Sequence, residues 1–399
     1  MKEKIKTWII SRNWIAFLKK TLMLMIMMFV IPISSSFLFG YNMQAKQIQH
    51  IPTIIVDRDN SSFSRTLTEE IRKNEIFNIV EYSDKDGDVQ KFIEQGKVMV
   101  GVVIPSSFSK DLSEGNGPKI LVFYDGSQMS ITSAAKARMS EILLTIKTGY
   151  LKKVMEGKLN VLPNQSIKTT LPMYFTYRLL NNPTRNYVNF LVPGMLIGII
   201  QIGLIMIGVD RVRDKEKFFL LCLGKSILWG VLGAISTIAT LWIQCHYFGV
   251  PYKGSISAGI KITLIYSIAI VSTGMLVRFI IPNKVLATQV AAIIVIPSSI
   301  LGGFTFPLMS MPKLFQQIAF FLPYVHYAEP IRDLSMKAID IKYISQDINW
   351  LIKFTVYIWI ISIIVFFSKK LMKFLRENSL NLRGAKNKEK VNSEVVAQV

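Results

Sequence analysis

Six long runs of apolar residues dominate the chain and predict helices that cross a membrane. A helix rises about 1.5 Å per residue, so about 20 apolar residues are needed to span a hydrocarbon core roughly 30 Å thick. The runs cover Thr21–Tyr41, Val188–Val209, Ser226–Phe248, Ser257–Val277, Val285–Gly303 and Trp350–Phe367. The first run follows several lysines and could instead be a secretory signal. No small-x-small cleavage pattern closes it, however, which favours a retained helix.

Basic residues near the span ends predict which way the chain crosses, because lysine and arginine there stay on the cytoplasmic side. With the N-terminus inside, all four cytoplasmic segments are basic. These segments are residues 1–20, Asp210–Lys217, Arg278–Lys284 and the tail 369–399. We therefore expect both termini in the cytoplasm. Ile5, Trp8 and Ile9 stand at helical spacing among lysines, so residues 1–20 are predicted to form an interfacial helix, with a flexible lead as the alternative.

The stretch between the first two spans, residues 42–187, differs in composition and predicts an independent domain outside the membrane. Four β-branched runs of strand length are bounded by turn residues: Ile51–Asp57, Phe77–Tyr82, Val98–Ile104 and Lys119–Asp125. Apolar residues at helical spacing lie between the first three runs, and a long helical pattern covers 129–155. The predicted fold class is an α-helical membrane protein with six transmembrane helices and an extracytoplasmic α/β domain inserted between the first and second.

The remaining boundaries follow from the same pattern. The first transmembrane helix is expected at 21–41, a five-helix transmembrane domain at 188–368 and a basic cytoplasmic tail at 369–399. The Lys-rich part of this tail after Lys386 is predicted to be disordered.

Composition and charge exclude several classes of protein. The chain is 51% hydrophobic and 18% charged, which is atypical of a soluble protein. Its net charge of +21 would suggest nucleic acid, but apolar runs interrupt the basic residues, so the expected partner is the lipid bilayer and not nucleic acid. Cys222 and Cys245 fall in one hydrophobic stretch that begins before the third span, and the three histidines are far apart, so no metal site is expected.

Two possible catalytic signals have simpler interpretations. Asp57, Asp59 and Asp125 follow predicted strands, where aspartate commonly closes a turn through its own backbone. The sequence Gly224-Lys225-Ser226 resembles the end of a phosphate-binding loop, but Phe219 stands where that loop needs glycine. We therefore expect no enzyme activity and no cofactor in this chain. Any ATP and Mg would be bound by a partner.

Polar residues inside the spans have two possible roles, helix–helix contact or a translocation path. They are Gln201, Gln244, Thr288, Gln289, Ser298 and Ser299. The absence of charge at mid-span argues against a proton- or sodium-driven carrier. Energy would then enter at the cytoplasmic segment Asp210–Lys217, which suits docking of a soluble subunit, although a solvated loop has the same charge pattern.

The order of elements resembles the membrane subunit of type-2 ABC exporters, in the branch with an external domain between the first two spans. The stretches that carry this resemblance are Ile296–Asp333, Asn181–Leu196, "IIVDRDNSSFSRTL", "VIPSSFSKDL" and "VFYDGS". The resemblance implies a re-entrant hairpin at 302–333, with the turn at Gly302, Gly303, Pro307 and Pro312. The cytoplasmic loop departs from the family because it is shorter and lacks a Gly-Thr pair, which puts coupling to an ATPase in doubt.

The resemblance also implies a function. The chain is expected to be the permease of an exporter in the bacterial cell (inner/plasma) membrane, paired with a cytoplasmic ABC ATPase subunit and a second permease subunit, as a homodimer or a sister heterodimer. Its cargo would be a drug, lipid or lipid-linked molecule. The implied ATPase-coupling residues are Arg211, Arg213, Asp214 and Glu216. The implied path and external gate comprise Val192, Met195, Gln201, Gln289, Ile300, Phe304 and Phe306. The alternative is a non-transporting receptor or assembly scaffold that presents the external domain.

Overall fold

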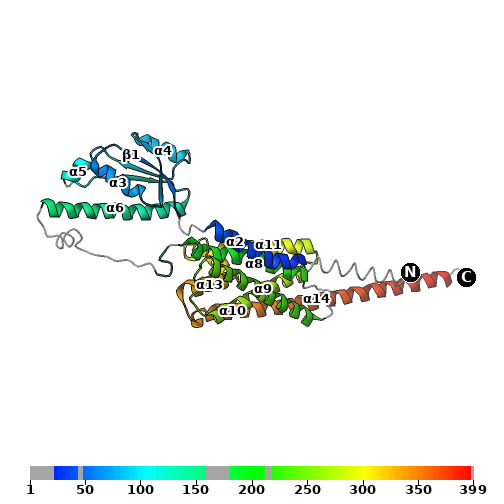
Figure 1. Cartoon of the computed structure of the whole chain (residues 1–399). Coiled ribbons are helices and arrows are strands. Elements are labelled where there is room, and N and C mark those ends of the chain that lie inside the picture. The colour runs from blue at the N-terminus through cyan, green and yellow to red at the C-terminus, as the bar shows by residue number, and fades with distance from the viewer. Residues whose placement is uncertain are drawn as a thin grey trace, which may run out of the picture. The chain divides into compact units, whose positions relative to one another are not determined.

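The chain divides into two compact units, Ala45–Leu179 and the remainder formed by Met1–Gln44 with Leu180–Val399 (Figure 1). The computed structural model describes residues 22–43, 48–114, 116–158, 180–184, 186–211 and 218–396. The predicted interfacial helix at 1–20 and most of the predicted coupling loop lie outside these residues.

The smaller unit is an α/β fold, as the alternating pattern predicts. Its strands are β1 (Ile51–Asp57), β2 (Phe77–Ser83), β3 (Val100–Ile104) and β4 (Leu121–Tyr124). Its helices are α3 (Ser62–Arg72), α4 (Asp86–Glu94), α5 (Phe108–Glu114) and α6 (Met129–Lys158). The sheet order is β2-β1-β3-β4, with β1 parallel to both β2 and β3 and with β4 antiparallel to β3.

Each face of the sheet is covered by helices (Figure 1). Ile51 and Ile55 of β1 point to a core that includes residues of α3, α5 and α6, whereas Ile54 and Val56 point to a smaller core with α4. Helix α4 packs closely enough that a Cβ at Gly101 would lie 2.2 Å from Val89. Burial on both faces thus holds the two central strands, β1 and β3, between layers of helix, whereas the outer strands β2 and β4 are more exposed.

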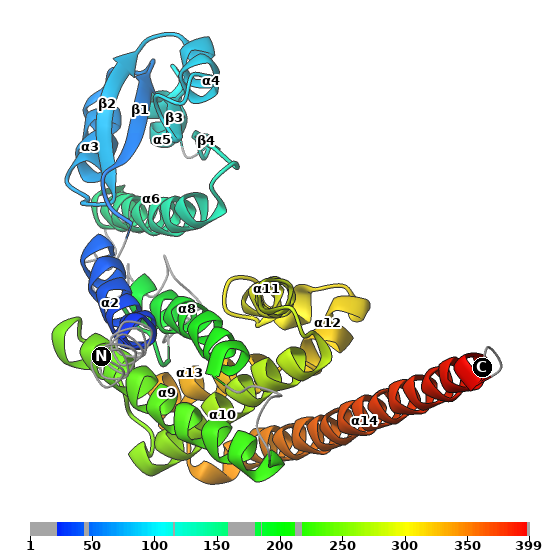
Figure 2. The same ribbon diagram turned by 90° about the vertical axis from the view of Figure 1, so that its right-hand side faces the viewer.

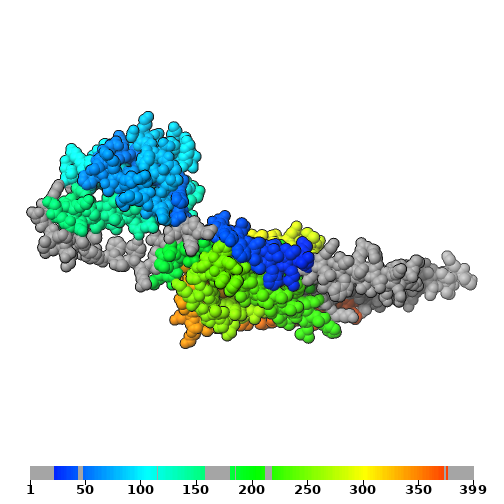
Figure 3. Space-filling view, viewed as in Figure 1, coloured from blue at the N-terminus to red at the C-terminus, as the bar shows by residue number. Residues whose placement is uncertain are grey.

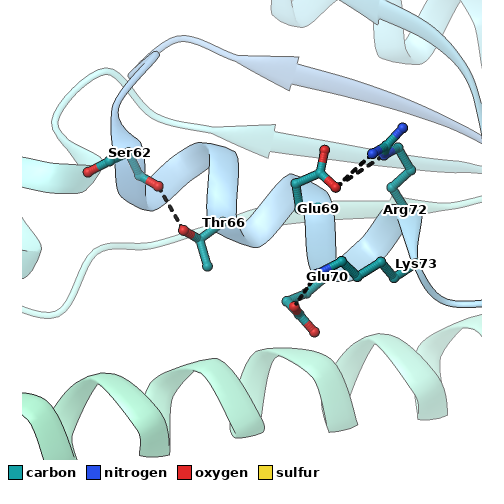
Figure 4. A network of polar contacts seen from close by, with 6 residues as sticks. All are labelled: Ser62, Thr66, Glu69, Glu70, Arg72 and Lys73. Atoms are coloured by element: carbon teal, nitrogen blue, oxygen red, sulfur yellow. Dashed lines mark hydrogen bonds and ion pairs between the residues drawn. The ribbon is translucent and has the colours of Figure 1, made fainter.

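The outer surface of α3 carries only weak polar contacts (Figure 4). Glu69 pairs with Arg72 at 2.9 Å and Glu70 with Lys73 at 3.4 Å, each three residues apart on the helix. Thr66 donates a hydrogen bond to the Ser62 carbonyl at 2.8 Å. Exposed pairs of this kind contribute little to stability, so the apolar face of α3 is what holds it to the sheet.

Asp57 and Asp125 close turns after their strands, as predicted, whereas the Asp59 carboxylate instead accepts hydrogen bonds from the Ser109 amide and hydroxyl of α5, at 3.1 and 2.8 Å. The Asp57 carboxylate accepts hydrogen bonds from the amides of Asp59 and Asn60, and Asp125 accepts one from the amide of Ser127. Hydrogen bonds from Ser127 lower the pKa of Asp125. Helix α5 is an element that the apolar pattern does not predict, because only Phe108 and Leu112 mark its buried side.

In the larger unit, six helices of the described residues are long and apolar enough to cross a membrane. The first combines a π-helical turn, η1 (Ile26–Val30), with α2 (Ile31–Asn42). The others are α8 (Tyr187–Arg211), α9 (Phe219–Tyr247), α10 (Ile256–Ile280), α11 (Lys284–Leu301) and residues Ile341–Met372 of α14 (Ile341–Val396). Helix α9 begins seven residues before the predicted start, because Gly224 and Lys225 lower the hydropathy without interrupting the helix.

Helix α14 also corrects the prediction of a disordered tail, because it continues to Val396 (Figure 2). The tail after Phe367 contains no proline, and Gly384 is its only glycine, so few residues there oppose continuation of the helix. The Lys-rich segment is therefore helical, and it extends α14 beyond the apolar bundle.

Between α11 and α14 the chain forms three short helices. These are η2 (Leu308–Ser310), α12 (Lys313–Phe320) and α13 (Val325–Lys337). Gly302 caps α11 and Gly303 has a φ of 77°, a left-handed conformation that favours glycine. Pro307 and Pro312 precede η2 and α12 directly. The two glycines and two prolines thus end one helix and begin the next two.

Helix α10 packs at the centre of the bundle and approaches α8 backbone to backbone. A Cβ at Gly208 would lie 2.2 Å from the carbonyl oxygen of Val271, and one at Gly274 would lie 2.2 Å from that of Ile205. Small residues at such crossings allow helices in lipid to gain close van der Waals contact.

Substitution of Gly208 by alanine is expected to lower the free energy of unfolding by about 1–3 kcal/mol, because α8 and α10 must separate. Gly224→Ala is the matched control, since nothing lies within 4 Å of a Cβ there. It should leave stability unchanged or raise it. Thermal unfolding of both variants in lipid nanodiscs provides the measurement, and equal melting temperatures would contradict the close approach.

Candidate functional site

Gln201 lies at the centre of a buried polar junction between helices. Its side chain is 1% exposed, and its Oε1 accepts hydrogen bonds from the Tyr266 hydroxyl and the Ser298 hydroxyl, each at 3.1 Å. Its Nε2 donates to the Val295 carbonyl at 3.4 Å. One amide from α8 is therefore bonded to both α10 and α11. An amide buried among apolar side chains needs such partners, so their loss would destabilise this packing.

The junction extends to α13 through stacked aromatic rings. Tyr266 and Tyr327 lie with ring centres 4.1 Å apart and planes inclined by 10°. The Tyr327 hydroxyl is 3.0 Å from the Thr263 hydroxyl, which belongs to α10. Both tyrosine side chains are buried. Four helices, α8, α10, α11 and α13, thus meet at two hydrogen-bonded sets, Gln201 with Tyr266 and Ser298, and Tyr327 with Thr263, which the stacked rings of Tyr266 and Tyr327 join.

A second set of contacts fixes the turn after α11. The Tyr324 hydroxyl donates to the Gly194 carbonyl at 2.8 Å, and its ring lies so close to Gly302 that a Cβ there would be 2.1 Å away. The Phe304 ring covers Gly194 in the same way, at 2.1 Å from the position of a Cβ. Glycines at 194 and 302 therefore make room for two aromatic rings, which lock the turn onto α8.

Arg332 of α13 completes the turn from the other side. Its guanidinium carbon lies 5.0 Å from the centre of the Phe304 ring, and its Nη1 donates to the Gly303 carbonyl at 3.3 Å. A cation above an aromatic ring is attracted to it, most strongly where water is excluded. The backbone of the turn is thus held by a charged side chain as well as by packing.

The structure separates the residues predicted for the path and gate into two groups. Gln201 and Phe304 are buried in the junction, and Val192 is buried against Phe39 and Met43. The others have side chains that are partly or largely exposed on this subunit. They are Met195, Gln289, Ile300, which is 61% exposed, and Phe306, which is 51% exposed.

The sequence did not predict the partners of Gln201. Tyr266 is the only tyrosine within the fourth apolar run, and Tyr324, Tyr327 and Arg332 follow the fifth. An aromatic residue with a hydroxyl inside an apolar run was the available signal, because a buried hydroxyl needs a hydrogen-bond partner. No spacing along the chain identifies that partner.

Arg211 is the one predicted coupling residue that the structure describes. Its side chain packs among the helices at the end of the bundle. Its side chain is 13% exposed, 3.7 Å from the Asp210 carboxylate and 5.4 Å from the ring centre of Trp229 in α9. Asp210 also pairs with Lys284 of α11 at 2.5 Å. These charges therefore tie the end of α8 to α9 and α11. Arg213, Asp214 and Glu216 lie outside the described residues.

His326 joins α12, α13 and α14 through a further set of contacts. Its Nδ1 is 2.8 Å from Asp347 Oδ1 and its Nε2 is 2.9 Å from the Phe320 carbonyl. The carbonyl can only accept, so Nε2 carries a proton. The ring also stacks on Trp350 at 3.9 Å. The start of α14 is thereby fixed against the turn that follows α11.

Comparison with known proteins agrees with this architecture. The sequence pattern of the family described as "ABC-2 family transporter protein" matches residues 19–364. The probable multidrug ABC transporter permeases YbhR and YbhS of Escherichia coli K12 are 22% and 23% identical to this chain, in each case covering 76% of it and 81% of the relative. The inner membrane transport permease YhhJ of the same organism is 21% identical, covering 59% of this chain and 64% of the relative.

Six apolar helices, with an α/β unit between the first and second, define a multi-pass membrane protein. The family match covers most of the chain, so this protein belongs to the ABC-2 transporter family and is an ABC transporter permease. Such a permease is not itself an ATPase. It implies an ATPase partner, and no cofactor is expected in this chain.

Replacement of Gln201 by leucine is expected to lower the free energy of unfolding by about 1–3 kcal/mol, because the buried Tyr266 hydroxyl loses its acceptor. Gln289→Leu makes the same change at an exposed position and should have little effect. Both are measured by thermal unfolding in nanodiscs. A similar loss in both variants would mean that the Gln201 junction contributes nothing specific.

His326→Phe keeps a ring against Trp350 but removes both hydrogen bonds, so we expect a loss of about 1–3 kcal/mol in the free energy of unfolding. The control is His246→Phe, because His246 also stacks on a tryptophan, Trp242, at 4.8 Å but is exposed. That variant should stay within about 0.5 kcal/mol of the wild type. Chemical denaturation followed by tryptophan fluorescence tests the pair, and the hydrogen bonds are dispensable if the two curves coincide.

Proposed function

We propose that this permease is one half of an exporter in which two membrane subunits bind two separate ATPase chains. It would move a hydrophobic or amphipathic molecule outward. The observation that carries this proposal is the junction at Gln201, which connects α8 to α11 and, through Tyr266 and Tyr327, to α13. A movement of α8 would therefore reach the turn at Gly302 and Gly303.

The orientation in the membrane is part of the proposal. Asp210, Arg211 and Lys284 gather at one end of the bundle, and Arg278 closes the neighbouring turn by donating to the Ile281 carbonyl at 3.2 Å. The positive-inside rule supports placing this end in the cytoplasm. Both termini would then be cytoplasmic, the α/β unit would be outside, and residues 302–333 would form a re-entrant hairpin at the external mouth. A bacterial plasma membrane location is supported by the similarity to YhhJ, an inner membrane transport permease.

The roles of the coupling residues differ. Arg213, Asp214 and Glu216 would face the ATPase, because they continue past the end of α8. Arg211 would transmit the force, since its packing against Trp229 and Asp210 holds the end of α8 to its neighbours. At the opposite end, Met195, Ile300 and Phe306 would line the path with the second subunit.

The chemistry of the bundle supports an apolar cargo. Among the described residues buried within the six spans, the polar side chains are hydroxyls and amides, and Asp210 at the cytoplasmic end is the one with a formal charge. A path for ions or strongly charged solutes would need compensating charge at membrane depth. The similarity to the probable multidrug permeases YbhR and YbhS supports drugs as one class of cargo.

Exchange of the charges at Arg213 and Glu216, as Arg213→Glu with Glu216→Arg, tests coupling with the net charge preserved. In proteoliposomes that contain the partner ATPase, we expect at least a tenfold loss of ATP-dependent uptake of an amphipathic dye. The matched control exchanges Arg138 and Glu141, an exposed pair of the same spacing on α6, joined at 2.8 Å. That variant should transport normally.

Three readouts separate the possible results. Co-purification reports docking, ATP hydrolysis reports coupling and dye uptake reports transport. If the Arg213 and Glu216 exchange leaves all three unchanged, the segment is a solvated loop. If the wild type hydrolyses ATP but moves no amphipathic compound, the export proposal fails and a scaffold role takes its place.

A further inference from the structure

The α/β unit contains a cavity that the proposed transport mechanism does not use. It has a volume of about 740 Å³ and lies between α5, the segment that leads into β4, and the second half of α6. Cavities of roughly 300–1,000 Å³ are typical of small-molecule sites. The cavity is therefore large enough for a small-molecule ligand.

The cavity exists because α6 is longer than the sheet that it covers. Ala135, Met139 and Ile142 of α6 pack into the core beneath the strands. The helix then continues beside α5 (Figure 1). In this part it contributes Leu143 and Ile146 to the cavity lining. Figure 3 shows α6 as a continuous ridge along one edge of the unit. The four-residue strand β4 leaves these apolar side chains without a cover.

One wall of the cavity is held in place by hydrogen bonding and ring packing. The Tyr150 hydroxyl donates to the Leu112 carbonyl at 2.6 Å, which joins α6 to α5. The Phe63 ring meets the Tyr150 ring edge-on, with centres 5.7 Å apart. The proton of the Tyr150 hydroxyl is therefore already donated within the protein. This wall of the cavity is held in place without a ligand.

The charge around the cavity has one sign. Among the described residues that line it, Lys119 and Lys147 are the only charged ones, and both are exposed. No ion pair among the described residues uses either lysine. Leu121 beside them is 55% exposed although it is apolar. The apolar lining suits a hydrocarbon chain, and the two lysines suit an anionic head group. The cavity therefore fits an acidic amphiphile.

We propose that this cavity binds a single long-chain acyl compound with an anionic head group. The hydrocarbon lies against Leu143, Ile146 and Phe108, and the head group lies between Lys119 and Lys147. A peptide is a poorer occupant, because apart from the two lysines and the Tyr150 hydroxyl the lining side chains are apolar and would leave most of its amide groups without a partner. This inference does not depend on transport or on an ATPase.

The experiment uses the full chain in nanodiscs of zwitterionic phosphatidylcholine, with palmitate that carries a diazirine within its chain as the ligand. After irradiation, mass spectrometry quantifies label on peptides that contain residues 108–121 and 143–151. We expect at least tenfold more label there than with the corresponding neutral alcohol. A laurate analogue should label much less, because each methylene removed weakens binding about fourfold when it is fully buried.

Variants locate the head group and the chain. Lys119→Glu with Lys147→Glu should lower labelling of the two peptides at least tenfold, whereas Lys136→Glu, an exposed lysine of α6 outside the lining, should leave it unchanged. Ile146→Trp should reduce labelling by filling the cavity. Equal labelling by the acid and the alcohol, or full labelling of the double lysine variant, would overturn the proposal. Wild-type protein without label on 143–151 would also overturn it, since the cavity would then be covered by another occupant such as a second copy.

Discussion

Hydrocarbon offers no hydrogen bond, and this constraint decides how the membrane unit is built. A buried amide, hydroxyl or carbonyl that is not used within its own helix is costly unless it finds a partner in a neighbouring helix. Gln201 satisfies this requirement with Tyr266, Ser298 and the Val295 carbonyl. The hydrogen bonds of Gln201 therefore also fix the positions of α8, α10 and α11 relative to one another.

The turn after α11 meets the same requirement with different groups. The carbonyl of Gly303 accepts from Arg332, and the carbonyl of Gly194 accepts from Tyr324. Aromatic rings occupy the space that side chains at Gly194 and Gly302 would fill. The glycines of this turn therefore serve both the backbone conformation and the packing, and the turn is part of the bundle and not a free loop.

Charge is confined to the ends of the bundle and has a structural role there. Asp210 pairs with Lys284, and Arg211 packs on Trp229, so a helix end that looks like a docking surface in the sequence is partly internal. The α/β unit follows the physics of a soluble fold, with apolar layers on both faces of a sheet. Its cavity is an exception, because apolar side chains of α6 stay uncovered where this helix extends past the sheet. Lys119 and Lys147 are the charged residues of the lining.

The sequence by itself determined the six spans, the inserted α/β unit, the turns at Asp57 and Asp125, and the break at Gly302 and Gly303. These features depend on local hydropathy, alternation and backbone preference, which neighbouring residues in the chain decide. The helical tail to Val396 and helix α5 were not predicted, because few apolar residues at helical spacing mark them in the sequence. Only the tertiary structure decided that Gln201 meets Tyr266, that His326 meets Asp347 and that Arg211 turns inward. Such partners are separated by many residues, and a buried polar group specifies that it needs a partner but not which one.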